Sequence, residues 1–193
     1  MKTDNYTEFI KQYTSEDTPL LQLLRLHQHE NNVVLHALLY IEECLSGTRL
    51  AKDAIRYARA VPLAESNPEI IILLLSRWAE LYCRIGQHKE ASSLLQHANT
   101  LLSENTHEEI SAALQYAESI LSGTRGNRTE QEKKLIHLLD ELSEKSPRKK
   151  FYLFEYSFFA AKQGRLLAAK EQFELLKNLT SPALPEEKIL LVK

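Results

Sequence analysis

Residues 78–102, WAELYCRIGQHKEASSLLQHANTLL, decide the fold that this sequence predicts. Apolar residues recur at helical spacing on both sides of Gly86, which indicates two helices joined by a tight turn. Glycine suits such a turn because it adopts a positive φ without a steric penalty. The segment therefore predicts a pair of helices with its turn at Gly86.

Three further glycines, Gly47, Gly123 and Gly164, each stand between two stretches with helical apolar spacing. The intervals between successive glycines are 39, 37 and 41 residues. Self-similarity at such a period is typical of a repeat architecture. We therefore expect an all-α protein, a right-handed α-solenoid of about four antiparallel helix hairpins with an extra N-terminal helical segment.

Composition and charge restrict the function classes. Of the 193 residues, 44% are hydrophobic and 26% are charged, and the net charge of −2 gives no basic footprint for nucleic acid. The polar N-terminus lacks the apolar core of a signal peptide. The longest apolar run, Ile70–Leu75, is too short to cross a bilayer. With two lone cysteines, Cys44 and Cys83, these features predict a cytoplasmic protein without membrane insertion.

Three segments are expected along the chain. Residues 1–30 form an N-terminal helical cap or groove-filling segment, and they include residues 20–26, which are apolar around most of a helix. Residues 31–182 form the helical repeat domain. Residues 183–193 form a C-terminal tail or partial capping helix.

The recurring side chains resemble those of tetratricopeptide repeats, most clearly in residues 68–103 and 147–182. In the first stretch the matching residues are Trp78, Ala79, Tyr82, Gly86, Ala91, Leu95 and Ala98. In the second they are Tyr156, Ser157, Ala160, Gly164, Ala169, Phe173 and Pro182. The usual period of that family is about 34 residues, so the longer intervals here imply longer loops between hairpins. A different α-solenoid with units of about 40 residues also fits.

The resemblance implies a concave face lined by the leading helix of each hairpin. Positions thirteen, ten and six residues before each turn glycine should point to this face. The partner-binding groove predicted in this way comprises Val34, Ala37, Ile41, Leu73, Ser76, Glu80, Ile110, Ala113, Ala117, Phe151, Phe154 and Phe158. The stripe is mostly apolar, and soluble monomers seldom expose large apolar patches. We therefore expect something to cover it.

The sequence is consistent with three ways of covering the apolar residues of the predicted groove. The chain can cover itself, with residues 20–26 or with the tail residues Ile189–Val192. Another protein can insert an amphipathic helix or an extended apolar segment. A second copy can pair as a homodimer. The second cover predicts a non-catalytic adaptor or chaperone, and small bacterial proteins similar to tetratricopeptide repeats include chaperones of type III secretion substrates.

A basic cluster is the alternative site, for an anionic partner or nucleic acid. It comprises Arg125, Arg128, Lys145, Arg148, Lys149 and Lys150. Glu141 and Glu144 stand four residues before Lys145 and Arg148, which favours neutralisation instead. His27, His29 and Glu30 lack the spacing of metal ligands on a helix. The sequence predicts no catalytic residues, no cofactor and no metal site.

Overall fold

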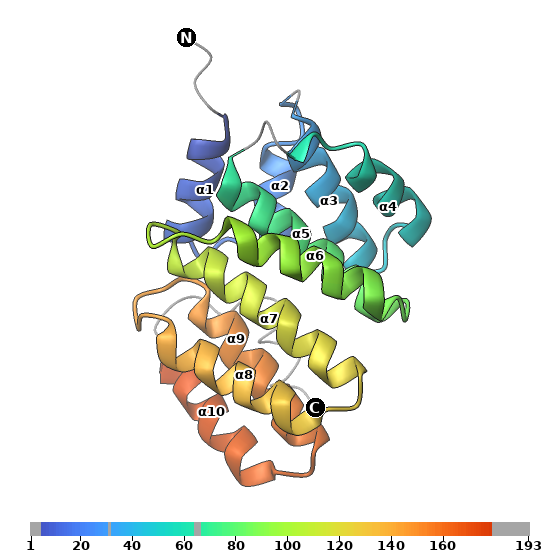
Figure 1. Cartoon of the computed structure of the whole chain (residues 1–193). Coiled ribbons are helices and arrows are strands. Elements are labelled where there is room, and N and C mark those ends of the chain that lie inside the picture. The colour runs from blue at the N-terminus through green and yellow to red at the C-terminus, as the bar shows by residue number, and fades with distance from the viewer. Residues whose placement is uncertain (1–4, 31, 64–66, 179–193) are drawn as a thin grey trace. The chain divides into compact units, whose positions relative to one another are not determined.

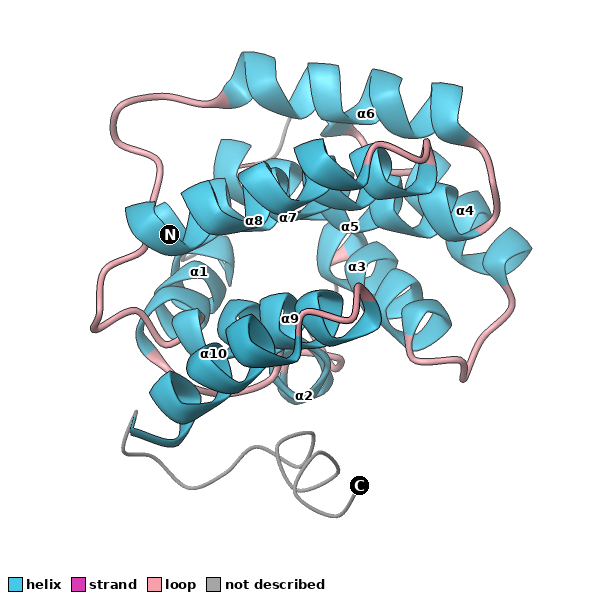
Figure 2. Ribbon diagram, turned by 90° about the horizontal axis from the view of Figure 1, so that it is seen from below, coloured by secondary structure: helices cyan, strands magenta, loops and turns pink. Residues whose placement is uncertain are grey.

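The structure, a computed structural model, describes residues 5–30, 32–63 and 67–178. Within these ranges every regular element is helical and no strand occurs (Figures 1 and 2), so the predicted all-α class is confirmed. None of the described helices is long and apolar enough to span a membrane. The predicted tail, residues 183–193, lies outside the described residues.

The chain divides into two compact units, Met1–Pro147 and Arg148–Lys193. The division falls inside residues 31–182, which the sequence assigns to one repeat domain. The helices of the first unit are α1 (Asn5–Ser15), α2 (Leu20–Leu26), α3 (Val33–Leu45), α4 (Ala51–Arg59), α5 (Pro68–Arg84), α6 (His88–Leu101), α7 (Glu108–Thr124) and α8 (Arg128–Glu141).

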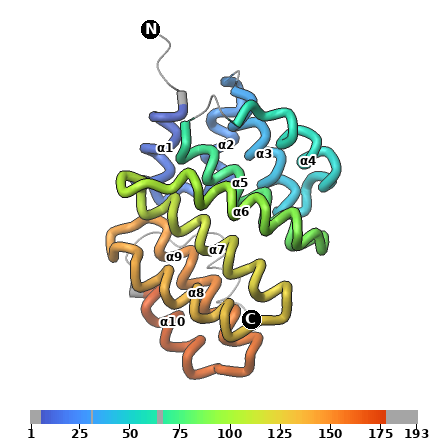
Figure 3. The backbone as a smooth tube through the Cα atoms, viewed as in Figure 1, coloured from blue at the N-terminus to red at the C-terminus, as the bar shows by residue number. Residues whose placement is uncertain are grey.

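Consecutive helices of the first unit pack in pairs, α3 with α4, α5 with α6, and α7 with α8 (Figure 3). The leading helices of these pairs also pack against one another, α3 against α5 and α5 against α7. The N-terminal segment joins the same layer, because α1 contacts α5 and α7 while α2 contacts α3. The leading helices are thus covered in part by residues of their own chain.

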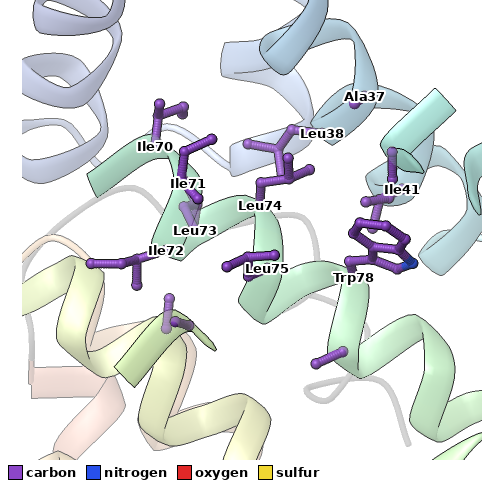
Figure 4. Close-up of a cluster of buried hydrophobic side chains, with 14 of the residues drawn as sticks. Ala37, Leu38, Ile41, Ile70, Ile71, Ile72, Leu73, Leu74, Leu75 and Trp78 are labelled. Carbon is purple, nitrogen blue, oxygen red and sulfur yellow. The ribbon is translucent and has the colours of Figure 1, made fainter. Parts of the chain in front are cut away.

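Helix α5 is the most deeply buried helix of the first unit. Each side chain of Ile70–Leu75 is at most 1% exposed. Figure 4 shows these residues and Trp78 beside Leu38 and Ile41 of α3. The helix starts where the sequence predicts, since the Asn67 side chain accepts a hydrogen bond from Glu69 N at 2.9 Å and Pro68 occupies the first turn.

Four glycine turns share one hydrogen-bond pattern. At Gly86 the glycine N–H donates to Cys83 O at 3.2 Å, and Gln87 N–H donates to Tyr82 O at 2.8 Å. The same two bonds recur at each turn, and this Schellman arrangement satisfies the last carbonyls of the leading helix. The four glycines, with φ between 76° and 85°, are Gly47, Gly86, Gly126 and Gly164.

The third turn is at Gly126, so the prediction of a turn at Gly123 is wrong. Gly123 lies inside α7, which continues to Thr124. The glycine intervals become 39, 40 and 38 residues, more regular than the sequence suggested. His107 and Asn127 occupy the N-cap positions of α7 and α8, and the Asn127 side chain accepts a hydrogen bond from Glu130 N.

Gly123 serves helix packing instead. A Cβ atom placed on it would lie 2.1 Å from Gln131 Oε1. Gln131 stands five residues after the turn glycine, where the α5–α6 pair has the fully buried Ala91. Gly123 therefore makes room on α7 for a larger side chain on α8.

The second unit contains α9 (Lys149–Lys162) and α10 (Leu166–Asn178), joined by the turn at Gly164 and packed against each other (Figures 1 and 2). One face of α9 is buried, and it carries Tyr152, Leu153, Tyr156, Phe159 and Ala160. Leu176 is the buried leucine of α10. The two helices run antiparallel because only three residues connect them.

The two glycines of the third pair should respond oppositely to alanine. Gly126→Ala should lower the free energy of unfolding by about 1–2 kcal/mol, because its φ of 85° is left-handed. Gly123→Ala combined with Gln131→Ala should raise it by about 1 kcal/mol, because alanine favours a helix interior and the clash is gone. Urea unfolding of both variants, with Gln131→Ala alone as the control, measures these changes. A neutral Gly126→Ala would contradict the assigned turn.

Candidate functional site

The first unit buries the part of the predicted groove that it carries. Nine of the predicted residues are at most 4% exposed: Val34, Ala37, Ile41, Leu73, Ser76, Glu80, Ile110, Ala113 and Ala117. The apolar ones share one core cluster with Phe9 of α1 and Leu23 of α2. These side chains stabilise the fold and are not presented to a partner in this structure. Because the third turn is at Gly126, the positions thirteen, ten and six residues before it are Ala113, Tyr116 and Ile120. They replace Ile110, Ala113 and Ala117 as the residues expected on the concave face of the third hairpin.

Glu80 belongs to a buried ion network. Arg77 donates to Glu42 of α3 through Nε and, at 3.1 Å, through Nη2, and it donates to Glu80 through Nη1. Arg84 donates to the other oxygen of Glu80 at 3.0 Å. The side chains of Glu42 and Glu80 are 9% and 4% exposed, so the arginines supply their main charge compensation.

Arg77 remains charged in this position. Burial lowers its pKa, but the adjacent Glu42 and Glu80 carboxylates outweigh burial and hold the pKa well above its usual value. The network joins α3 to α5 at the level of the predicted groove. Its bidentate geometry fixes how these two helices pack, so Glu80 has a structural position here.

Within the first unit, the residues of the predicted basic cluster lie toward opposite ends of α8 and not in one patch. Arg125 and Arg128 lie at the start of α8, and Arg125 donates to His88 O at 3.2 Å. Lys145 follows the other end of this 14-residue helix, which spans about 21 Å. Arg148, Lys149 and Lys150 belong to the second unit and are only 8–9% exposed. The arrangement does not favour a continuous anion-binding surface.

A polar hollow of about 310 Å³ opens between the start of α7 and the end of α8. Two of its carboxylates already have protein partners. Glu108 accepts from Ser143 N at 3.3 Å, and Glu141 accepts from Gln115 Nε2 at 2.6 Å. These hydrogen bonds connect α7 to α8 and to the segment after α8. We therefore interpret the hollow as a structural contact between these elements and not as a ligand site.

Of the two histidines noted in the sequence, His27 is buried and serves packing, whereas His29 is exposed. His27 Nδ1 lies 2.5 Å from Glu30 Oε1 and Nε2 lies 2.7 Å from Gln12 Oε1, while the ring packs edge-on against Phe9. His27 thereby joins α1 to the end of α2. Among the described residues, no group of three or more His, Cys, Asp or Glu side chains is placed to hold a metal ion.

Helix α9 presents a second apolar face to solvent. Phe151, Phe154 and Phe158 are spaced by three and four residues and share one side of the helix. Phe151 is 37% and Phe158 is 43% exposed, and Phe154 is half-buried. The rings of Phe154 and Phe158 stack at 6.5 Å between centroids, and Lys162 Nζ lies 4.2 Å from the Phe158 centroid. We call these three residues the α9 phenylalanine face.

This face makes α9 apolar around nearly its whole circumference. A helix of that kind is normally buried on more than one side. Burying a whole phenylalanine contributes about 1.5–3 kcal/mol, and with about two-fifths of two rings exposed the face can contribute about 1–2.5 kcal/mol. Three further exposed side chains of the second unit are Leu166, Leu167 and Leu175 on α10. Among the described residues of the second unit, Phe158, Leu166, Leu167 and Leu175 therefore leave part of their apolar side chains exposed.

No model of a known protein family, no curated protein sequence and no solved structure matches this chain. The candidate site is therefore defined by the geometry and chemistry of the chain's own residues.

Loss of the Arg77 charge should destabilise the first unit. Arg77→Met leaves the buried Glu42 carboxylate without its arginine and Glu80 with Arg84 alone, so the free energy of unfolding should fall by about 3–5 kcal/mol. Arg84→Met, on the same helix and also next to Glu80, should cost at most about 1 kcal/mol because Arg84 is 52% exposed. Thermal or urea unfolding compares the two variants. Equal losses would refute the special position of Arg77.

The two free cysteines should react slowly in the folded chain. Burial raises the pKa of the Cys83 thiol and of the Cys44 thiol, so less of the reactive thiolate is present at pH 8. Cys44 is half-buried and should be alkylated before the buried Cys83. Mass spectrometry after timed iodoacetamide treatment, with a urea-unfolded sample as control, gives both rates. Faster reaction of Cys83 than of Cys44 would contradict this assignment.

Proposed function

We propose that this chain is a non-catalytic adaptor or chaperone that binds an apolar helix or extended segment of another protein. In this proposal its helix pairs form a right-handed α-solenoid similar to tetratricopeptide repeats, with about four hairpins. The four equivalent glycine turns at intervals of 38–40 residues support the repeat. Helical solenoids generally offer extended surfaces to macromolecules, which agrees with a binding role.

The α9 phenylalanine face is the observation that carries the binding proposal. Exposed aromatic side chains give a large contact area at low entropic cost and are enriched in interaction hot spots. The rest of the predicted groove is already buried, so the binding surface shifts from the whole concave stripe to the second unit. Type III secretion-type chaperones are one class of adaptor that this proposal includes.

The kind of partner expected follows from comparing the free energy gained by burying the α9 phenylalanine face with the free-energy cost of association. Complete burial of the α9 phenylalanine face supplies about 1–2.5 kcal/mol. Association itself costs at least about 4 kcal/mol in lost translational and rotational freedom. A partner must therefore add its own apolar side chains and reach further residues, of which Leu166 and Leu175 are exposed on α10. An amphipathic helix with aliphatic residues along one side meets this requirement.

Phe158→Asp should reduce capture of the native partner at least about tenfold, as expected for a buried hot-spot aromatic. Phe154→Glu should act in the same direction. Pull-down from the source cell, followed by quantitative mass spectrometry, compares each variant with the unchanged chain. Ile136→Asp on α8 is the matched control, because Ile136 is 40% exposed and Phe158 is 43% exposed.

Two outcomes would overturn this proposal. If Phe158→Asp retains the circular dichroism of the unchanged chain and captures the same partners equally well, the face is not the binding surface. If sedimentation instead shows a mass above 22.2 kDa that Phe158→Asp reduces to the monomer, the face is covered by a second copy.

A further inference from the structure

We propose that the outer face of α4 is a docking surface for a short acidic segment of another protein. This face carries Lys52, Arg56 and Arg59, whose spacing of four and three residues places them on one side of the helix. All three are exposed, whereas the buried Ala54 and Ala58 lie on the other side of α4, which packs against α3 and α5 (Figure 1). We call the three basic residues the α4 basic stripe.

The charge of the α4 basic stripe is largely uncompensated. Within the described part of the chain, Asp53 is the carboxylate that pairs with it, and Asp53 Oδ1 lies 3.9 Å from Arg56 Nη2. The Arg56 side chain is 74% exposed, so this ion pair is weak. Arg59 donates to the Tyr82 hydroxyl at 3.5 Å, a long hydrogen bond to a neutral group. The stripe therefore keeps its positive charge for an external partner.

Stabilisation of α4 does not account for the whole stripe. Cations in the last turn of a helix interact favourably with the helix dipole, which explains Arg56 and Arg59. Lys52 is the second residue of α4, however, and the positive end of the dipole disfavours a cation there. Helix formation alone would favour an acidic residue at this position. We therefore attribute the stripe to recognition.

The charge of the first unit selects the kind of partner. Residues 1–147 contain 15 basic and 21 acidic residues, so the stripe is a positive site on a unit of net charge −6. A short acidic segment is repelled elsewhere on this unit and steered to the stripe. From Lys52 to Arg59 the stripe spans about 10 Å along the helix. That length matches two or three carboxylates of a peptide, whereas a nucleic acid or a membrane surface would extend over the acidic surroundings.

A tyrosine beside the stripe supplies an apolar contact. The exposed Tyr57 ring lies 5.6 Å from the Arg56 guanidinium and packs on Tyr40, with 4.2 Å between ring centroids. Tyr40 is held in turn by the Arg49 guanidinium, 3.8 Å from its centroid. Tyrosine and arginine are enriched in interaction hot spots, and a ring that is already fixed loses little entropy on binding. We therefore expect an apolar residue next to the carboxylates of the partner.

A single charge reversal tests the docking surface in the full-length chain. The probe is a fluorescein-labelled peptide of four glutamates and one leucine, and its binding is followed by fluorescence anisotropy at low salt. Lys52→Glu should weaken binding at least about fivefold, because an attraction becomes a repulsion. Lys89→Glu is the matched control, since Lys89 is exposed and is the second residue of α6. Equal affinities of the two variants would overturn the inference.

The same variant separates docking from a structural role. Glutamate in the first turn of α4 interacts favourably with the helix dipole, so Lys52→Glu should leave the melting temperature unchanged or raised. Weaker peptide binding by a variant of undiminished stability supports a docking surface. A loss of binding that appears only together with a lower melting temperature would assign Lys52 to the fold and reject the proposal.

The location and the class of partner are tested with further probes. A benzophenone group on the peptide should crosslink to residues 49–60, and crosslinks confined to the second unit would reject the α4 surface. A single-stranded oligonucleotide of 20 bases and phosphatidylserine vesicles are titrated under the same conditions. Tighter binding of either probe than of the peptide, with the same loss in Lys52→Glu, would overturn the assignment to an acidic protein segment. The inference does not rest on the α9 phenylalanine face.

Discussion

Burial of α5 is the constraint on which the first unit depends. Ile70–Leu75 gives this helix aliphatic side chains on every side, so one neighbouring helix cannot cover it. The chain surrounds α5 with α3, α6, α7 and α1, and the pairing of α5 with α6 becomes one part of a larger layer. Arg77 then meets Glu42 across this packing, which adds an electrostatic requirement to an otherwise apolar contact. The relative positions of α3 and α5 follow from both.

The local structure could be predicted well because its causes are local. Helix spacing, the Asn67–Pro68 start and three of the four turn glycines follow from residues close together in sequence. The position of the third turn could not be predicted, because Gly123 and Gly126 lie between the same two helical stretches and either could form the turn. In the structure the end of the Gln131 side chain on the next helix lies where a Cβ at position 123 would be. That contact is tertiary and leaves no periodic signal.

The candidate site shows the same limit. The sequence identified a mostly apolar stripe on the leading helices, and in the first unit the structure buries those residues. Periodicity describes a face, however, and does not state what lies against it. For Leu73 and Ile110 the cover is the core that includes Phe9 of the same chain. For Phe158 the described residues leave the ring partly open, and only this difference in burial separates a folding surface from a binding surface.

The size of the second unit bears on why Phe158 is partly exposed while the predicted groove residues of the first unit are buried. In the described residues of the second unit, α9 packs against α10, and one apolar side of α9 is buried while Phe151 and Phe158 on the other side are partly exposed. Replacing Phe158 by a polar residue would reduce the exposed patch and leave the buried Tyr156 and Phe159 in place. The exposed parts of the Phe151 and Phe158 rings add nothing to the packing of the buried side. Their energetic benefit arises only when a further segment, from this chain or another, covers them.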